Sequence, residues 1–195
     1  VNKLFTEDEI DGLEEYLLSL VNLKVNGIVF SDMAVFQIAK RNNFINLLVY
    51  DPDTLMVNQY DVSVFKQLGI QEVILSKDIT LDNIKDICDY NPNFCSILAY
   101  GHFPLFYSKR KLVENYFKAY KKDAKKYIEN RFLTVKEATR NGLYPIYQDN
   151  NGTIIYSDQK ICYLNYISDI KKCKVHSLYL FFYDEDFNEA TSIVN

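Results

Sequence analysis

The chain has 195 residues, of which 48% are hydrophobic and 25% are charged. This length and composition favour a folded domain with a buried core and exclude a largely disordered chain. The formal net charge of −4 argues against a general electrostatic attraction of the whole chain to nucleic acid.

No apolar run approaches the roughly 20 residues that cross a bilayer, so we expect a soluble protein with no membrane partner. The sequence starts at Val1 without a charged and apolar leader, which favours a cytoplasmic location. The missing initial methionine suggests a fragment of a longer protein. The four cysteines, at 88, 95, 162 and 173, contain no CxxC pair, so reduced thiols are expected rather than a metal site.

The first predicted element is a helix over 6–24. Thr6 is followed three residues later by Glu9, the spacing of a capping box, and apolar residues then recur on one helical face. Four short apolar stretches follow, each leading into a predicted helix, and their centres lie about 20 to 26 residues apart. The predicted strands are 26–32, 46–51, 71–78 and 95–101, and the helices are 33–41, 59–69, 81–90 and 110–127.

Strands that alternate with helices at this spacing predict βαβ units and a parallel sheet. After Arg131 the pattern changes to short β-rich segments, with "DNNG" as a hairpin turn, then a helix over 159–172 and a return strand in "VHSLYLFFY". We therefore expect an α/β fold, a partial TIM-like barrel in a single domain 1–195. Residues 1–130 and 159–195 would form its βα units, and 131–158 an antiparallel β insertion. An open doubly wound sheet is the alternative, although no GxGxxG or P-loop motif is present.

Polar side chains follow the predicted strands at the edge where parallel α/β folds carry their functional groups. They include Asp32, Asp51, Asp78 and, in the loop after the fourth strand, His102. Such groups can perform acid–base chemistry or hold a hard metal ion. The three aspartates also stand just before helices, where an aspartate commonly caps the first turn.

The stretch "AYGHFPLFYSKR" is interpreted as a loop at this edge and as a binding surface. The binding residues predicted there are Tyr100, Gly101, Tyr107, Ser108, Lys109 and Arg110. The helix that follows is basic, because residues 109–131 contain nine Lys or Arg against three acids, with tyrosines and a phenylalanine between them. This composition suits contact with a nucleic-acid backbone, and it also suits the solvated face of an ordinary helix.

The same loop carries a resemblance to a known family. The stretch "YGHFPLFYSKRKLVENYF" resembles a branch of the U-32 peptidases, the collagenase-like proteases, found in low-GC Gram-positive bacteria. That branch has a His-Gly-His strand end, an apolar and aromatic loop and then Ser-Lys-Arg. The resemblance extends upstream through "VNKLFTEDEIDGLEEYLLSL" and "VNQYDVSVFKQLGIQEVILSKDIT" and downstream through "YPIYQDNNGTIIYSDQKICYL".

The chain departs from the family pattern at several positions. Tyr100 replaces the first histidine of the branch motif, and Ser96 replaces a glutamate of the broad signature. Pro104 and Lys111 stand where that signature has cysteines. Asp78 stands where the family usually has the final acid of a strand that ends in a sequence like "LSKE". The resemblance implies a TIM-like barrel, but the missing cysteines remove the ligands for the iron–sulfur cluster that some members carry. The cofactor is therefore left unknown, and no metal ligands are predicted.

Two functions follow from these observations. The first is a peptidase that acts on a peptide or protein substrate, with Asp32, Asp78 and His102 as its catalytic groups and an activated water as its nucleophile. The alternative is a non-catalytic or accessory module that binds RNA or serves RNA modification, since other members of the family hydroxylate RNA bases. The open edge of the predicted sheet further suggests a homodimer.

Overall fold

The computed structural model describes residues 1, 3–128, 133–139 and 141–194. The chain divides into two compact units. Unit 1 comprises 1–99 and 163–179, and unit 2 comprises 100–162 and 180–195. Two strands, β4 (Cys95–Gly101) and β10 (Ser177–Leu180), run across the boundary between these segments.

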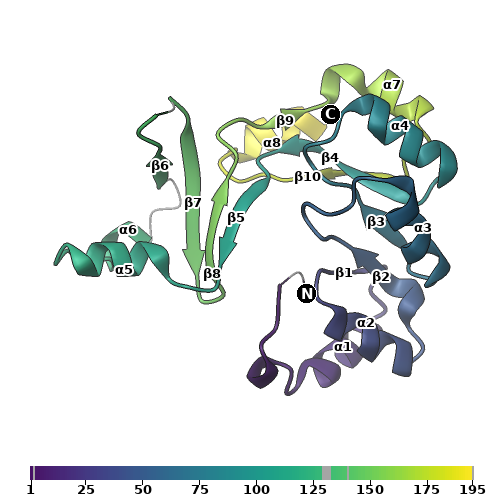
Figure 1. Cartoon of the computed structure of the whole chain (residues 1–195), viewed down its shortest axis with the longest axis horizontal. Helices are drawn as coiled ribbons and strands as arrows, with labels where there is room; N and C mark the ends of the chain where they lie inside the picture. Colours follow the sequence, from purple (N-terminus) through teal and green to yellow (C-terminus); the bar gives the residue numbers. More distant parts are fainter. Residues whose placement is uncertain (2, 129–132, 140, 195) are drawn as a thin grey trace. The chain divides into compact units, whose positions relative to one another are not determined.

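Unit 1 is built on the parallel sheet that the sequence predicts (Figure 1). Its strands lie in the order β1-β2-β3-β4, each parallel to the next, and β10 lies beside β4. The remaining elements of unit 1 are η1 (Glu7–Glu9), α1 (Leu13–Asn22), β1 (Ile28–Phe30), α2 (Met33–Arg41), η2 (Ile45–Leu47), β2 (Leu48–Tyr50), α3 (Gln59–Gln67), β3 (Glu72–Ile74), α4 (Leu81–Tyr90), η3 (Leu164–Tyr166) and α7 (Ile167–Lys172).

The core of unit 1 lies where the helices pack on this sheet. Its strands are apolar on both faces, as expected for parallel strands that are covered by helices. Fully or almost fully buried side chains come from strands and helices alike, among them Leu17, Phe30, Val35, Leu48 and Leu75. Burial of this kind, at about 25 cal/mol per Å² of apolar surface, is the main stabilising contribution to such a core.

Local capping fixes where several helices begin. Thr80 caps α4 because its hydroxyl accepts a hydrogen bond from the Asn83 N–H. The predicted capping box at Thr6 is also present, since the Glu9 carboxylate accepts from the Thr6 N–H. It begins only the short turn η1, however, and α1 starts after Gly12, whose φ of +80° breaks the continuous helix expected over 6–24.

Unit 2 is built on an antiparallel sheet with the order β5-β8-β7-β6 (Figure 1). Pairing of β7 with β8 through the turn at 150–151 confirms the hairpin predicted at "DNNG". The elements of unit 2 are β5 (Pro104–Ser108), α5 (Leu112–Ala119), α6 (Lys125–Ile128), β6 (Thr134–Lys136), β7 (Leu143–Asp149), β8 (Gly152–Tyr156), β9 (Ile161–Cys162) and α8 (Phe187–Val194).

Several segments differ from the sequence-based expectation. Residues 104–108 form strand β5 rather than a loop, because they pair with β8 along its length. The helix expected over 110–127 ends at Ala119, since Lys121 adopts a left-handed conformation with φ of 53°. The helix expected over 159–172 begins only at Ile167, after β9 has paired with residues 100–101. Residues 131 and 132, at the start of the predicted insertion, lie outside the described residues.

The fold class is mixed α/β, with one parallel and one antiparallel sheet. The described strands do not close into a barrel, because β1 and β10 are at opposite ends of the strand order and do not pair. The TIM-like barrel predicted from the sequence is therefore not confirmed.

Candidate functional site

The carboxyl ends of β2 and β3 in unit 1 carry an ion cluster of two buried residues, Lys77 and Asp51, and the partly exposed Asp53. The Nζ atom of Lys77 lies 2.6 Å from Oδ1 of Asp51 and 3.0 Å from Oδ1 of Asp53. Burial would lower the pKa of Lys77, but the two carboxylates outweigh it and the pKa is raised. Lys77 therefore stays protonated at neutral pH and is poorly suited to act as a nucleophile.

The other aspartates predicted at this edge have different partners. Asp32 caps α2, with Oδ1 accepting from the Ala34 N–H and Oδ2 accepting from the Phe5 N–H, both at 2.8 Å. Asp78 accepts a hydrogen bond from the Ser76 hydroxyl at 2.5 Å, and α4 is capped by Thr80 instead. The capping interpretation therefore holds for Asp32 but not for Asp78.

His102 belongs to unit 2 and lies directly after the last residue of β4. Its side chain is 6% exposed, and Nδ1 lies 2.7 Å from the carbonyl oxygen of Ser157. Because a carbonyl oxygen only accepts, Nδ1 carries the proton, and in the neutral ring Nε2 keeps its lone pair. Nε2 lies 4.0 Å from Oδ1 of Asp184. The ring is thus held in one tautomer, and its Nε2 atom, near the carboxylate of Asp184, is available for proton transfer.

A second set of charges adjoins His102 in the same unit. Lys160 pairs with Asp184 at 2.5 Å and with Glu185 at 2.7 Å, and its ammonium lies 5.9 Å from the centre of the Tyr100 ring. Burial would raise the pKa of Glu185, but hydrogen bonds from Lys160 and Tyr100 lower it to about 2. Glu185 is therefore ionised throughout the physiological pH range.

Sequence reasoning found His102 and Tyr100 in this cluster but missed its other charged members, Lys160, Asp184 and Glu185. Each lies more than 55 residues along the chain from His102, and none belongs to a recognisable motif. The only signal was the acidic "DED" directly after the apolar "LYLFFY". Contacts over such separations depend on the fold and cannot be read from local spacing.

Three of the predicted binding residues, Gly101, Tyr107 and Ser108, make contacts within unit 2. Gly101 has φ of +124°, and a Cβ built there would come closer than 3.0 Å to the carbonyl oxygen of Phe181. Tyr107 donates its hydroxyl hydrogen to the carbonyl of Asn151 at 2.9 Å. Ser108 accepts a hydrogen bond from the backbone N–H of Arg110 at 3.1 Å. Tyr107 thus links β5 to the turn between β7 and β8, whereas the hydrogen bond of Ser108 is local to the residues that follow β5.

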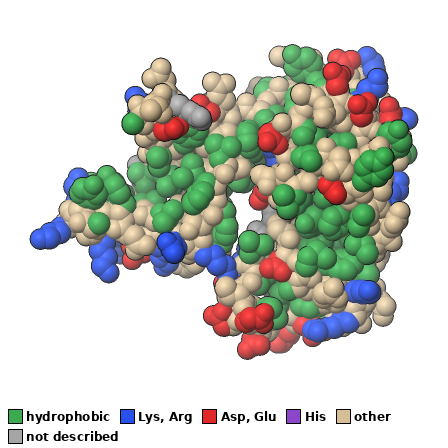
Figure 2. Space-filling view, in the orientation of Figure 1, with side chains coloured by type: hydrophobic (Ala, Val, Ile, Leu, Met, Phe, Trp, Pro, Cys, Tyr) green, Lys and Arg blue, Asp and Glu red, His purple; other side chains and the backbone are tan. Residues whose placement is uncertain are grey.

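The strongest concentration of positive charge follows β5. Figure 2 shows Lys and Arg side chains over α5 and α6, with hydrophobic side chains, a class that here includes tyrosine, between them. We call residues 109–125 the basic segment; its exposed cations are Lys109, Arg110, Lys111, Lys118, Lys121, Lys122 and Lys125. Val113 anchors the segment, because it is buried and its backbone N–H donates to the Gln148 side chain. Lys118 therefore lies on an anchored helix, and the other cations lie directly before α5, in the turn after it or at the start of α6.

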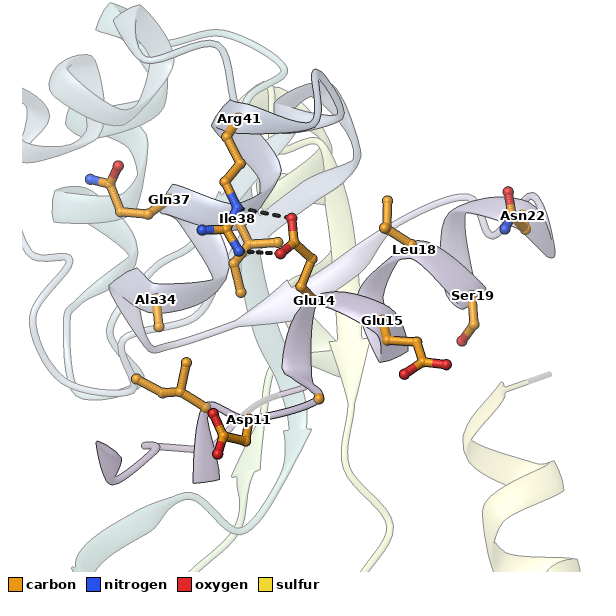
Figure 3. Close-up of a pocket in the computed structure, with 12 residues that line it drawn as sticks. Asp11, Glu14, Glu15, Leu18, Ser19, Asn22, Ala34, Gln37, Ile38 and Arg41 are labelled. Atoms are coloured by element: carbon orange, nitrogen blue, oxygen red, sulfur yellow. Dashed lines mark hydrogen bonds and ion pairs between the residues drawn. The ribbon is translucent and has the colours of Figure 1, made fainter. Parts of the chain in front are cut away.

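Unit 1 also contains a surface pocket between α1 and α2 (Figure 3). Glu14 from α1 and Arg41 from α2 form an ion pair at its wall, and Asp11 and Glu15 add further negative charge. None of the residues predicted as site residues lines it. Because Arg41, the one cation among its lining residues, is already paired with Glu14, and none of its polar lining side chains is buried, the pocket defines no chemistry.

Across the ranges that the structure describes, no three His, Cys, Asp or Glu side chains are grouped so that they could hold a metal ion. The cysteines are free thiols, with Cys88, Cys95 and Cys173 buried and Cys162 exposed. The absence of an iron–sulfur cluster or zinc ion remains a prediction. Among the described helices, none is both long and apolar enough to cross a membrane.

The sequence of the chain matches a known family. A sequence model described as peptidase family U32 matches residues 1–180, and the chain therefore belongs to that family. A protein of Bacillus subtilis (strain 168), tRNA hydroxylation protein P2, is 30% identical over 174 residues, which are 87% of this chain and 56% of the relative.

A second relative comes from Haemophilus influenzae. This protein, tRNA hydroxylation protein P, is 28% identical over 102 residues, which are 51% of this chain and 22% of the relative. No solved structure matches the chain significantly. The chain thus spans little more than half the length of the Bacillus relative and a smaller part of the Haemophilus relative.

The prediction of a peptidase is contradicted by these relatives, since both are named for tRNA hydroxylation. The resemblance identified the family correctly, but the family name describes proteolysis, and one fold can serve several reactions. A peptide substrate has no support. The alternative that the sequence left open, a role in RNA modification, agrees better with the relatives.

Proposed function

We propose that this chain is an RNA-binding module that takes part in tRNA hydroxylation. The observation that carries the proposal is the basic segment of unit 2. It collects seven exposed cations within 17 residues of a chain whose net charge is −4. The names of the two relatives supply the kind of RNA and the reaction.

The electrostatics of the basic segment suit the backbone of a folded RNA. Each lysine or arginine that approaches a phosphate releases condensed counterions, so a local cluster gives strong binding at low salt even when the whole chain is acidic. Such contacts fix the position of the RNA and carry little sequence information. The basic segment would therefore hold the tRNA, while the chemical step depends on other groups.

Salt-dependent tRNA binding tests this proposal. We expect the chain to bind bulk tRNA with an affinity that falls steeply as salt rises. Replacing Lys118, Lys121 and Lys122 by glutamine should weaken binding and make the plot of log affinity against log salt shallower by about two units. The matched control replaces three exposed lysines of unit 1, Lys24, Lys40 and Lys85, and should change little. Equal effects of the two triple variants would contradict a role for the basic segment.

For the chemical step we propose His102 as the participating group of unit 2. Its fixed tautomer leaves Nε2 able to accept a proton, and Asp184 would stabilise the imidazolium that results. Asp32 and Asp78 of unit 1 remain proposed site residues, although the contacts of Asp32 suit a structural role. In cells that lack the gene, we expect a His102→Gln copy to bind tRNA normally but to fail to restore hydroxylation, measured by mass spectrometry of digested tRNA. Full restoration would exclude this role.

We also propose a barrel-like architecture, a cellular location and an oligomeric state for the chain. The parallel order β1-β2-β3-β4, with α2, α3 and α4 in the connections, suits a segment of a TIM-like barrel. A role in tRNA modification suits the cytoplasm. The proposed homodimer would form along the β1 edge of the sheet, and light scattering at micromolar concentration would show twice the mass of one chain.

A further inference from the structure

Two tyrosines of the basic segment, Tyr116 and Tyr120, are exposed although they follow the buried Val113 at helical spacing and so lie on the same side of the helix. Tyr116 is 58% exposed and Tyr120 is 64% exposed. Their spacing of four residues places them side by side at the end of α5, and their ring centres are 4.8 Å apart. The helix is held to its unit through other residues, chiefly Val113, so burial does not explain these two rings.

The paired rings have a rigid base. Phe117 packs edge-on against Tyr116 at 5.4 Å and stacks on Tyr127 of α6 at 4.0 Å, with only 10° between the latter two ring planes. This aromatic cluster ties α6 to α5. It also limits the motion of Tyr116, so that stacking a planar ligand there costs little side-chain entropy.

The charges around the two rings indicate the kind of ligand. Lys118, Lys121, Lys122 and Lys125 are all exposed near them in the chain. In contrast, Glu114 and Asp123 are the only acids among residues 109–125. A ligand that combines flat apolar rings with regular negative charge fits such a surface, and a nucleic acid with unpaired bases has both.

We infer that Tyr116 and Tyr120 form a stacking platform for unpaired bases of an RNA strand whose phosphates contact the neighbouring lysines. This inference rests on the proposed RNA-binding function and adds to it the form of RNA that is recognised. A fully paired helix hides its base faces, so the platform would engage a loop or a single-stranded end. The same lysines alone would bind duplex and single strands without such a distinction.

The turn after α5 supports this arrangement. The N–H of Lys122 donates to the carbonyl of Phe117 at 2.9 Å, and the N–H of Lys121 donates to the carbonyl of Lys118 at 3.0 Å. These two bonds define a Schellman motif that reverses the chain immediately after Tyr120. Lys121 and Lys122 are thus fixed beside the exposed rings rather than carried away by a longer helix.

The absence of tryptophan from the chain allows a direct test. A Tyr120→Trp variant places a single indole on the platform, and Tyr60→Trp places one on a similarly exposed tyrosine of unit 1. On titration with an unstructured oligoribonucleotide, we expect the indole fluorescence of the Tyr120→Trp variant to be quenched and that of the Tyr60→Trp variant to stay unchanged. A blunt-ended RNA duplex of the same length, which has neither a loop nor a single-stranded end, should quench neither.

Affinity measurements complete the test. Replacing both tyrosines by alanine should weaken single-strand binding at least about tenfold and leave duplex binding and the salt slope unchanged, whereas phenylalanine at both positions should preserve binding. Tyr60→Ala and Tyr90→Ala serve as controls. Salt-dependent RNA binding without any effect of the alanine variants or any quenching would overturn the platform and leave the proposed function intact. If the unaltered chain binds no RNA at low salt, both proposals fail.

Discussion

The ammonium nitrogen of Lys77 lies 2.6 Å from Oδ1 of Asp51, and only 5% and 6% of the two side chains are exposed. They come from the ends of neighbouring parallel strands, 26 residues apart. Each charge compensates the other in surroundings that would otherwise make ionisation costly. Removing one member of the pair should therefore lower the stability of unit 1, because it leaves the other charge buried without compensation.

We expect Lys77→Met to destabilise unit 1 by about 3 kcal/mol, because it leaves the Asp51 carboxylate buried without its cation. Urea unfolding followed by circular dichroism measures the change, and Lys40→Met on the exposed face of α2 is the control. The double variant Lys77→Met and Asp51→Leu should recover part of the loss, since only the partly exposed Asp53 carboxylate then remains without the Lys77 cation. A Lys77→Met midpoint equal to that of the control would show that the pair is unimportant.

Gly101 is expected to tolerate no side chain. A Cβ there would collide with the carbonyl of Phe181, and a φ of +124° is a conformation that other residues rarely adopt. Gly101→Ala and Gly101→Val should both lower the melting temperature by several degrees or prevent folding. Gly27→Ala is the comparison, because the nearest atom to its Cβ is a flexible glutamine oxygen at 3.3 Å. Equal melting temperatures for the variants at the two positions would contradict the close approach.

The ion pair of Lys160 with Glu185 predicts a specific acid sensitivity of unit 2. The pKa of Glu185 is lowered from 4.5 to about 2, so the unfolded chain binds a proton at higher pH than the folded chain does. The stability that this group contributes is present above about pH 4.5 and is lost as the pH falls towards 2.

Denaturant unfolding between pH 7 and pH 3 checks this sensitivity. Glu185→Gln should be less stable than the unaltered chain at pH 7, and the difference between them should shrink as the pH approaches 3. Glu189→Gln, on the exposed helix α8, should follow the unaltered chain throughout. A difference that is constant with pH would mean that the carboxylate of Glu185 does not titrate with folding.

The sequence predicted the parallel part of the fold because that part is encoded locally. Each predicted strand centre, Ile28, Leu48, Ile74 and Leu98, falls within β1, β2, β3 or β4. Short runs that are apolar on both faces, followed by capped amphipathic helices, have few other ways to fold. The capping box at Thr6 and the helix cap at Asp32 were similarly visible in the sequence.

Contacts between distant segments were not visible in the same way. His102 binds the carbonyl of Ser157, 55 residues further on, and Lys160 meets Asp184 and Glu185 across 24 and 25 residues. Strand β5 was taken for a loop because Pro104 and a bulge near Phe106 obscure its alternation. The peptidase prediction was wrong for a different reason, since a family signature identifies descent rather than reaction.

The last prediction concerns Lys121, which follows the end of α5 at a position where sequence rules would favour glycine. Lys121 occupies the left-handed position of the Schellman motif, where glycine is usual and other residues are strained. Lys121→Gly should therefore stabilise unit 2 by about 0.5–1 kcal/mol, since it relieves that strain while the two backbone hydrogen bonds remain. Lys118→Gly, only three residues earlier but inside the helix, should destabilise it by about 1 kcal/mol. Because the two variants remove the same charge from the same surface, opposite signs in thermal unfolding isolate the backbone effect, and a loss of stability in both would show that α5 continues past Ala119 in solution.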